Sequence, residues 1–227
     1  MTKELLENIF LFKDLEEQEM DKIIDKIKFK KYKKSEILFW KGDLGDALYI
    51  IQKGKIKITE LSENGREKIL TIFAKGDFLG EMAIIDGEKR SASAETLEES
   101  EVYVLYKKDF LDILKSNFLL TMKIFQILSK RVRDLNKEVR ILTFGDVYER
   151  FVELLIELSN KYGKEENGKL MIDINLTHME LANMIGVTRE TVTRIIGKLK
   201  KENIIAIENK NIIILDKNKI KQQKIIL

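Results

Sequence analysis

The sequence predicts an α+β protein with three parts: an N-terminal antiparallel β-roll of the double-stranded jelly-roll type, a long dimerisation helix, and a C-terminal winged helix-turn-helix. Three observations predict this order. Apolar residues alternate with polar ones between positions 37 and 105, and they repeat at steps of three and four up to position 142. Helix caps and a glycine turn then follow one another between positions 177 and 188. We therefore expect domains at 1–117, 118–144 and 145–227.

The totals exclude several kinds of site. The chain has 227 residues, no cysteine and one histidine, so we expect no disulfide, no iron–sulfur cluster, no thiolate-ligated haem and no His/Cys metal site. Nothing resembles a nucleophile and its base, so we expect no enzyme. The N-terminus lacks the apolar core of a signal peptide, and no run reaches the ~18 apolar residues of a membrane span. We expect a soluble cytoplasmic protein.

The expected roll follows amphipathic helical patterns around 5–12 and 17–27. The stretch ALYIIQKGKIKITEL alternates on both sides of Gly54, which predicts a hairpin there. REKILTIFAKGD predicts another strand. Glycines separate short strands at fairly regular spacing, which favours a roll or small barrel over a parallel sheet.

The expected long helix runs from about Phe110 into the 140s. Aligned as heptads, β-branched or aromatic residues fill position a and leucines fill position d, a combination that favours a parallel two-stranded coiled coil. The alternative is a helix packed against its own domain. The candidate dimer residues are Phe125, Val132 and Val139 at a, and Leu128, Leu135 and Leu142 at d.

The C-terminal part opens with an amphipathic helix over VYERFVELLIELSNKYG, a polar loop over GKEENGK and a strand over LMIDI. Thr177 and Glu180 then form a capping box that starts a helix. Gly186 makes a turn, and Thr188 caps a second helix. IIAIENKNIIIL follows as a two-stranded wing turning at 209–210. This order predicts a helix-turn-helix that reads double-stranded DNA; the alternative is a helical hairpin whose charges face solvent.

The second helix of this motif divides into two faces. Its buried face is Val192, Ile195, Ile196 and Leu199. Its opposite face has arginine, which can bond guanine, and glutamate, which can accept from cytosine. The candidate DNA contacts are Thr177, His178, Thr188, Arg189, Glu190, Thr193 and Arg194, with Lys198 and Lys200 suited to phosphates. From 177 to 227 there are ten Lys and Arg against five Asp and Glu, which suits a polyanionic partner.

The order of a β-roll, a dimer helix and a winged helix resembles the Crp/Fnr family of bacterial transcription regulators, nearly end to end. TRETVTRIIGKL is similar to the family's recognition helix, with Arg189, Glu190 and Arg194 at the base-reading positions. The resemblance implies a homodimer on a palindrome related to TGTGA…TCACA, with half-sites about 34 Å apart. It also implies RNA polymerase as a partner and no membrane association.

GEMAIIDGEKRSA, residues 80–92, resembles the phosphate-binding cassette of cyclic-nucleotide domains. The resemblance implies that Glu81 bonds the ribose 2′-hydroxyl and that Arg90 pairs with the cyclic phosphate. The other implied effector contacts are Gly80, Met82, Ala83, Ser91, Arg131 and Asn136. The alternative is an Arg90–Glu81 ion pair in a roll without a ligand.

The identity of the effector stays open. The cassette indicates a cyclic nucleotide, for example cAMP. The cAMP-sensing members have two hydroxyl residues where this chain has Leu135 and Asn136, so the base of the nucleotide is not determined. The oxygen- and haem-sensing branches do not fit, because the chain lacks cysteine and suitable haem ligands. We expect a ligand-gated dimeric regulator. The alternatives are the same DNA reader with a roll that senses no nucleotide, or a nucleotide-sensing regulatory subunit of another protein.

Overall fold

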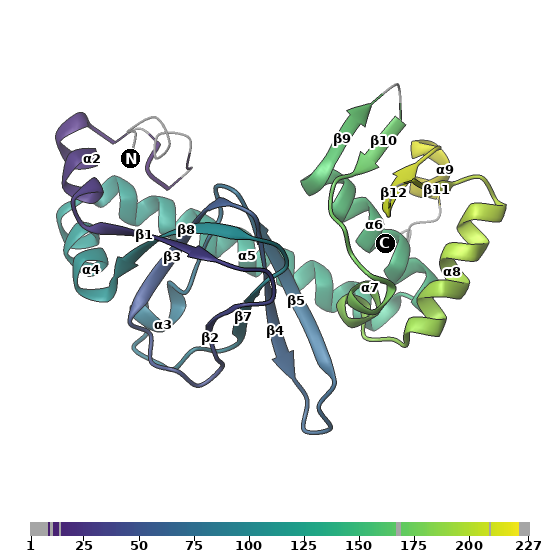
Figure 1. The fold of residues 1–227 in the computed structure, drawn as a ribbon, viewed down its shortest axis with the longest axis horizontal. Helices are drawn as coiled ribbons and strands as arrows, with labels where there is room; N and C mark the ends of the chain where they lie inside the picture. The colour runs from purple at the N-terminus through teal and green to yellow at the C-terminus, as the bar shows by residue number, and fades with distance from the viewer. Residues whose placement is uncertain (1–8, 10, 14, 167–168, 209, 223–227) are drawn as a thin grey trace. The chain divides into compact units, whose positions relative to one another are not determined.

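The fold was analysed in a computed structural model that describes residues 9, 11–13, 15–166, 169–208 and 210–222 (Figure 1). Contacts divide the chain into two compact units, Met1–Val132 and Arg133–Leu227. The helical pattern around 5–12 lies largely outside the described residues, and so does position 209 of the expected wing turn. None of the described helices combines the length and the apolar character that crossing a membrane requires.

The first unit contains two four-stranded antiparallel sheets, which confirms the expected roll (Figure 1). One sheet has the order β1-β8-β3-β6 and the other has the order β2-β7-β4-β5. The strands are β1 Ile27–Tyr32, β2 Ile37–Phe39, β3 Ala47–Lys53, β4 Lys55–Leu61, β5 Glu67–Ala74, β6 Phe78–Leu79, β7 Ser93–Thr96 and β8 Ser100–Tyr106.

Strand β3 shows how the roll is packed. Successive side chains of a strand point to opposite faces, and five consecutive residues of β3 are buried, so both of its faces are covered. Leu48 and Ile50 join a cluster with residues of four helices. Tyr49 and Ile51 join a second cluster with Ile56 of β4 and other residues of both sheets. The first sheet therefore lies between the helices and the second sheet.

The hairpin expected at Gly54 is wrong. Strands β3 and β4 belong to different sheets, and β4 instead forms its hairpin with β5. At Gly54 the chain passes from one sheet to the other with φ +91°, and a Cβ there would lie 2.7 Å from the carbonyl oxygen of Glu99. Alternation on both sides of a glycine predicts two strands, but it does not determine whether they pair with each other.

The expected continuous helix from Phe110 is also wrong. It is two helices, α4 Lys107–Ser116 and α5 Phe118–Phe144, separated at Asn117. The Oδ1 atom of Asn117 accepts from the backbone N–H of Leu120 at 2.8 Å, and its Nδ2 donates to Glu19 of α2 at 2.6 Å. The asparagine therefore caps α5 and ties it to α2. Helix α2 covers Glu17–Ile24, so it ends before Ile27, which opens β1.

The second unit is a winged helix-turn-helix, as expected. Its helices are α6 Val147–Tyr162, α7 His178–Ile185, α8 Arg189–Lys201 and α9 Lys217–Gln222. Its sheet has the order β11-β12-β10-β9, from β9 Gly163–Glu166, β10 Lys169–Ile172, β11 Ile205–Glu208 and β12 Asn211–Ile214. The loop expected over GKEENGK is wrong, because Gly163–Glu166 pairs with β10 as a strand. The Asn-Gly pair in that stretch is a hairpin signal that could have predicted it.

The turn of the helix-turn-helix has the expected local chemistry. The backbone N–H of Glu180 donates to the Thr177 hydroxyl, and the Glu180 carboxylate accepts from the Thr177 N–H at 2.7 Å. Gly186 ends α7 in the left-handed conformation, with φ +70°. Thr188 accepts from the N–H of Thr191 and caps α8. These local bonds fix where both helices begin.

Candidate functional site

Arg90 is almost fully buried, with 3 % of its surface exposed. It lies just before β7, next to the four-residue helix α3 Met82–Ile85. Its Nη1 donates to the Gly80 carbonyl oxygen at 2.6 Å, and its Nη2 donates to the Ala47 carbonyl oxygen at 2.7 Å and to the Asp46 carboxylate at 3.3 Å. The guanidinium also lies 4.4 Å from the ring centroid of Phe39. Arg90 therefore joins the start of β3 to the segment that follows β6.

One nitrogen of this guanidinium makes no hydrogen bond to the protein. The Nε atom of Arg90 is buried and has no hydrogen-bond partner among the described residues. A buried donor without a partner costs free energy, so such atoms are rare in folded proteins. The site therefore has a positive charge and an unused N–H directed at no protein acceptor, which suits an anion.

Glu81 is the most deeply buried acid of the site, with 1 % of its surface exposed. Its Oε1 accepts from Nη1 of Arg131 on α5, and Nη2 of Arg131 donates to the Phe78 carbonyl oxygen at 2.7 Å. The rings of Phe73 and Phe78 lie 4.7 and 5.1 Å from the Arg131 guanidinium. Burial raises the pKa of the Glu81 carboxyl, and the charges of Arg131 and then Arg90 offset part of that rise.

The ion pair considered from the sequence, Arg90 with Glu81, is wrong. The structure pairs Glu81 with Arg131 and Arg90 with Asp46. The nine-residue interval between acid and base therefore does not place them against each other; each is paired by a residue from another segment.

Two glycines permit this arrangement. Gly80 has φ +90°, and a Cβ there would lie 2.6 Å from Nη1 of Arg90. A Cβ at Gly45 would lie 2.6 Å from the carbonyl oxygen of Ala83 in α3. Gly45, Asp46 and Ala47 were missed by sequence reasoning. No local signal predicts them, because they reach the cassette from about 40 positions earlier in the chain.

The remaining expected effector residues are less closely assembled. Met82 and Ser91 are exposed, while Ala83 is buried in α3. Asn136 is an exposed residue of α5 beyond Val132, where the first unit ends. Within the described part of the chain, no group of three or more His, Asp and Glu side chains is placed to hold a metal ion.

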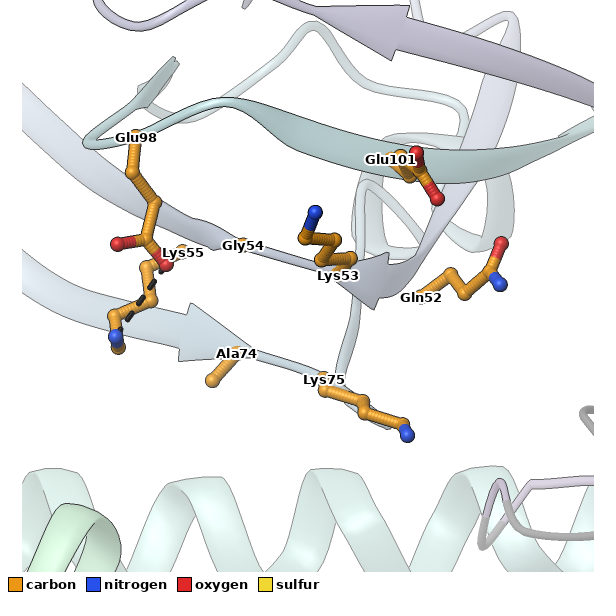
Figure 2. A pocket seen from close by; sticks show the side chains of 8 residues that line it. All are labelled: Gln52, Lys53, Gly54, Lys55, Ala74, Lys75, Glu98 and Glu101. Atoms are coloured by element: carbon orange, nitrogen blue, oxygen red, sulfur yellow. Dashed lines mark hydrogen bonds and ion pairs between the residues drawn. The ribbon is translucent and has the colours of Figure 1, made fainter. Parts of the chain in front are cut away.

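A separate hollow of about 390 Å³ contains none of the cassette residues (Figure 2). Three of its five charged side chains are in ion pairs: Lys55 lies 3.3 Å from Glu98, and Glu101 accepts at 2.9 Å from Lys31, which is not part of the lining. The lining is Gln52, Lys53, Gly54, Lys55, Ala74, Lys75, Glu98 and Glu101. We assign it no ligand.

Helix α5 carries an exposed apolar stripe. Its a and d residues are between 44 and 61 % exposed, with one exception. Leu128 is half-buried and packs against the helical cluster of the first unit. The exposed members are Phe125, Val132, Leu135, Val139 and Leu142. A stripe of this length on one helix is typical of a surface that another helix covers.

Helix α8 presents its charged face to solvent. Its four expected inner residues are buried, while Arg189, Glu190, Thr193 and Arg194 are all exposed. The neighbouring backbone N–H and the Thr188 hydroxyl lower the pKa of the Glu190 carboxyl. The lowered pKa favours the ionised form of Glu190.

The two expected phosphate-binding lysines differ. Nζ of Lys198 lies 4.1 Å from the ring centroid of Tyr148 and 4.0 Å from the Glu202 carboxylate, so it turns toward α6 and its own helix. Lys200 is exposed and has no ion pair within the described chain. Lys200 is therefore the freer of the two. Nearer the start of α8, the Thr193 hydroxyl lies 2.9 Å from Nδ1 of His178, the first residue of α7.

Comparison with known proteins adds the following findings. Residues 29–117 match the cyclic nucleotide-binding domain family, and residues 149–223 match the Crp-like helix-turn-helix domain family. The chain is 34 % identical to the anaerobic regulatory protein of Bacillus subtilis, over 90 % of this chain and 87 % of that protein. It is 30 % identical to the cyclic AMP receptor protein of Thermus thermophilus, over 86 % of this chain and 87 % of that one.

Among solved structures, the chain is similar to a transcriptional regulator of the CRP/FNR family from Thermus thermophilus, TTHA1359. The TM-score is 0.72 at 27 % identity, and the match covers 86 % of this chain and 97 % of the other. Both expected types of domain are therefore present in the expected order.

Proposed function

The chain belongs to the Crp/Fnr family of transcription regulators, with a cyclic nucleotide-binding domain and a helix-turn-helix, and from this premise we propose that it is a homodimeric, effector-gated regulator of specific operators. The effector is a cyclic nucleotide such as cAMP, bound at residues 80–91. The predicted DNA contacts, from Thr177 to Lys200, then lie on the operator.

The observation that carries the effector proposal is the unused Nε of the buried Arg90. A cyclic phosphodiester has one negative charge and two free oxygens, so a guanidinium with a spare donor can both neutralise and bond it. Ser91 is exposed beside Arg90 and can add a hydroxyl donor. The backbone at Met82 and Ala83 begins α3 and can donate to the same group.

Glu81 supplies the second half of recognition. Its carboxylate is an acceptor for a ribose 2′-hydroxyl, and it is held in place by Arg131. A bound ribose would compete with Arg131 for this carboxylate. Arg131 lies on α5 one residue before the first unit ends, so a change in its pairing acts on the helix that leads to the DNA-binding unit. A ligand shifts a protein between two conformations only if it binds one of them more tightly than the other. The change in Arg131 pairing would supply that difference in affinity.

The relatives support a cyclic nucleotide without choosing its base. The Thermus relative is a cyclic AMP receptor protein by name, while the Bacillus relative is an anaerobic regulatory protein. Asn136 can both donate to and accept from a purine edge, so it is compatible with more than one base.

The apolar stripe of α5 supports the dimer. Leucine at d with β-branched residues at a favours two parallel strands, which would present two α8 helices to the two half-sites of a palindrome. RNA polymerase is the expected protein partner of such a complex.

Effector binding is tested by calorimetry and thermal unfolding of the full chain with cAMP, cGMP, 2′-deoxy-cAMP and 5′-AMP. Ligand at a hundred times its dissociation constant should add about 2.7 kcal/mol, or several degrees. Loss of the 2′-hydroxyl should weaken binding roughly ten- to hundredfold, as for a hydrogen bond to a charged group. Ser91→Ala should weaken binding while the unliganded melting temperature stays unchanged.

If cAMP and its 2′-deoxy form bind with equal affinity, Glu81 does not bond the ribose 2′-hydroxyl. If no cyclic nucleotide binds while the protein still selects an operator, the roll senses another effector or none. If no DNA sequence is selected with any nucleotide, the proposed regulator is wrong and a regulatory subunit becomes the better interpretation.

A further inference from the structure

In the hydrogen bond between His178 of α7 and Thr193 of α8, the donor and the acceptor can be assigned. The Thr193 hydroxyl donates to the Arg189 carbonyl oxygen one turn earlier, at 2.9 Å. A hydroxyl has one proton, so the 2.9 Å contact between Thr193 Oγ1 and His178 Nδ1 needs the proton on the histidine. Nδ1–H is therefore the donor, and the Nε2 atom of the neutral ring carries only a lone pair.

Protonation changes what this ring can do. A neutral His178 with its proton on Nδ1 cannot donate from Nε2, whereas the imidazolium donates from both nitrogens and carries a charge. His178 is exposed and lines a hollow of about 480 Å³ with Thr177, Met179 and Arg189. Since His178 is the only histidine of the chain, no other imidazole can supply the same effect.

The charged groups around this hollow come from two helices. Arg189 of α8 lines it, while Glu190, the next residue, is not part of the lining. On α7, the Glu180 carboxylate accepts from the N–H and the hydroxyl of Thr177, at 2.7 and 2.8 Å. Helix α6 also packs on α7 but contributes none of the hollow's described lining. Neither acid lines the hollow, so an anion entering here meets Arg189 and the histidine.

We propose that His178 is a proton-dependent contact to the DNA backbone, and that Thr193 is the brace that orients it rather than a reader of bases. Protonated His178 donates from Nε2 to a phosphate oxygen beside Arg189; neutral His178 does not. DNA binding then takes up a proton, so affinity rises as the pH falls. This inference rests on the proposed DNA contact of α7 and α8.

The first test is made on the free protein. NMR of the full chain labelled with ¹⁵N has a single imidazole spin system, because there is one histidine. The neutral form should show the proton on Nδ1. A neutral ring protonated on Nε2 would overturn the inference, whatever the protein does with DNA.

The second test measures the affinity for a duplex with TGTGA and TCACA half-sites, and for a scrambled duplex, between pH 5.5 and 7.5 at fixed salt. The wild type should bind both roughly tenfold more tightly at pH 5.5, the effect of one charge-assisted phosphate contact. His178→Asn keeps a donor near the Nδ1 position but cannot become charged, so it should bind with little dependence on pH. Thr193→Val should reduce the pH dependence without changing which sequence is preferred.

The outcomes separate this inference from the proposed function. If wild type and His178→Asn bind DNA with the same pH dependence, the histidine contact is wrong while the DNA reader stands. A changed sequence preference in Thr193→Val would return Thr193 to base reading and overturn the brace. If neither protein binds any duplex at any pH, with or without a cyclic nucleotide, the DNA-binding proposal fails with it.

Discussion

The effector cassette and the DNA-reading helix use charge in opposite ways. In the cassette, Glu81 and Arg90 are 1 and 3 % exposed, and each is held by protein partners. On α8, Arg189 and Arg194 are exposed, and neither side chain has an ion pair within the described chain. The first region uses its charges to hold itself together, while the second leaves them for another molecule.

This difference predicts whether a mutation in each region lowers stability, binding or both. Breaking a buried pair leaves a charge without solvent or partner, which costs stability. Removing an exposed charge changes stability by about 0.5 kcal/mol or less, because water already solvated it. We therefore expect Glu81 and Arg90 to affect folding as well as binding, and Arg189 and Arg194 to affect binding alone.

The largest effect is expected from Arg131→Ala. It leaves the Glu81 carboxylate buried without its main partner, so the free energy of unfolding of the first unit should fall by about 3 kcal/mol. Trp40 is the only tryptophan and lies in this unit, so urea unfolding followed by its fluorescence reports the right part of the chain. If the free energy of unfolding falls by less than about 1 kcal/mol, the buried charges of the cassette do not differ from the exposed charges of α8 in their effect on stability.

A double variant serves as the control. Glu81→Gln combined with Arg131→Met removes both charges and should recover much of the lost stability. If the double variant is as unstable as Arg131→Ala, the loss comes from packing against Phe73 and Phe78 and not from the unpaired carboxylate.

Gly45→Ala should have the next largest effect on stability. Its Cβ would lie 2.6 Å from the Ala83 carbonyl oxygen, so α3 or the Gly45 backbone must move. Such overpacking costs about 1–3 kcal/mol. The Trp40 unfolding curve should shift by that amount, and cyclic-nucleotide affinity should fall because α3 carries part of the cassette. Unchanged unfolding and unchanged binding together would mean that the backbone adjusts freely.

Arg194→Ala should leave the unfolding curve unchanged and weaken binding to the preferred operator by about 1–3 kcal/mol. The reason is the loss of a base contact, so the preference at particular positions should relax. Lys200→Ala is the matched control: it should weaken binding to all sequences and reduce the salt dependence by about one unit. A uniform loss across sequences for Arg194→Ala would show that it contacts phosphates.

The same contrast explains how far the sequence could predict this protein. The DNA reader depends on local chemistry: the Thr177 and Thr188 caps and the Gly186 turn act within a few residues, so its elements were predictable almost to the residue. The cassette motif was also recognisable. Its partners were not, because Ala47 and Asp46 meet Arg90 only after the sheets have formed.

Two of the errors have the same origin. The false hairpin at Gly54 and the unbroken helix through Asn117 each came from a correct local pattern that tertiary contacts override. Ser100 and Glu99 occupy the space around Gly54, and Glu19 binds the Asn117 side chain. Alternation and helical periodicity contain no information about these partners, since they are about 45 and 98 positions away.

The smallest effect, and the one that compares the two regions most directly, is expected from Gly197→Ala. Gly197 lies inside α8, and a Cβ there would meet nothing within 4 Å, unlike those at Gly45 and Gly80. An alanine in a helix interior is favoured over glycine by about 1 kcal/mol, so the second unit should become more stable by that amount. Calorimetry of the full chain should show its transition rising by several degrees, with no change in the Trp40 signal. A fall in stability would show that α8 needs its glycine as the cassette needs Gly45. The cassette, which is packed by its own side chains, and the exposed face of α8 would then no longer differ in this respect.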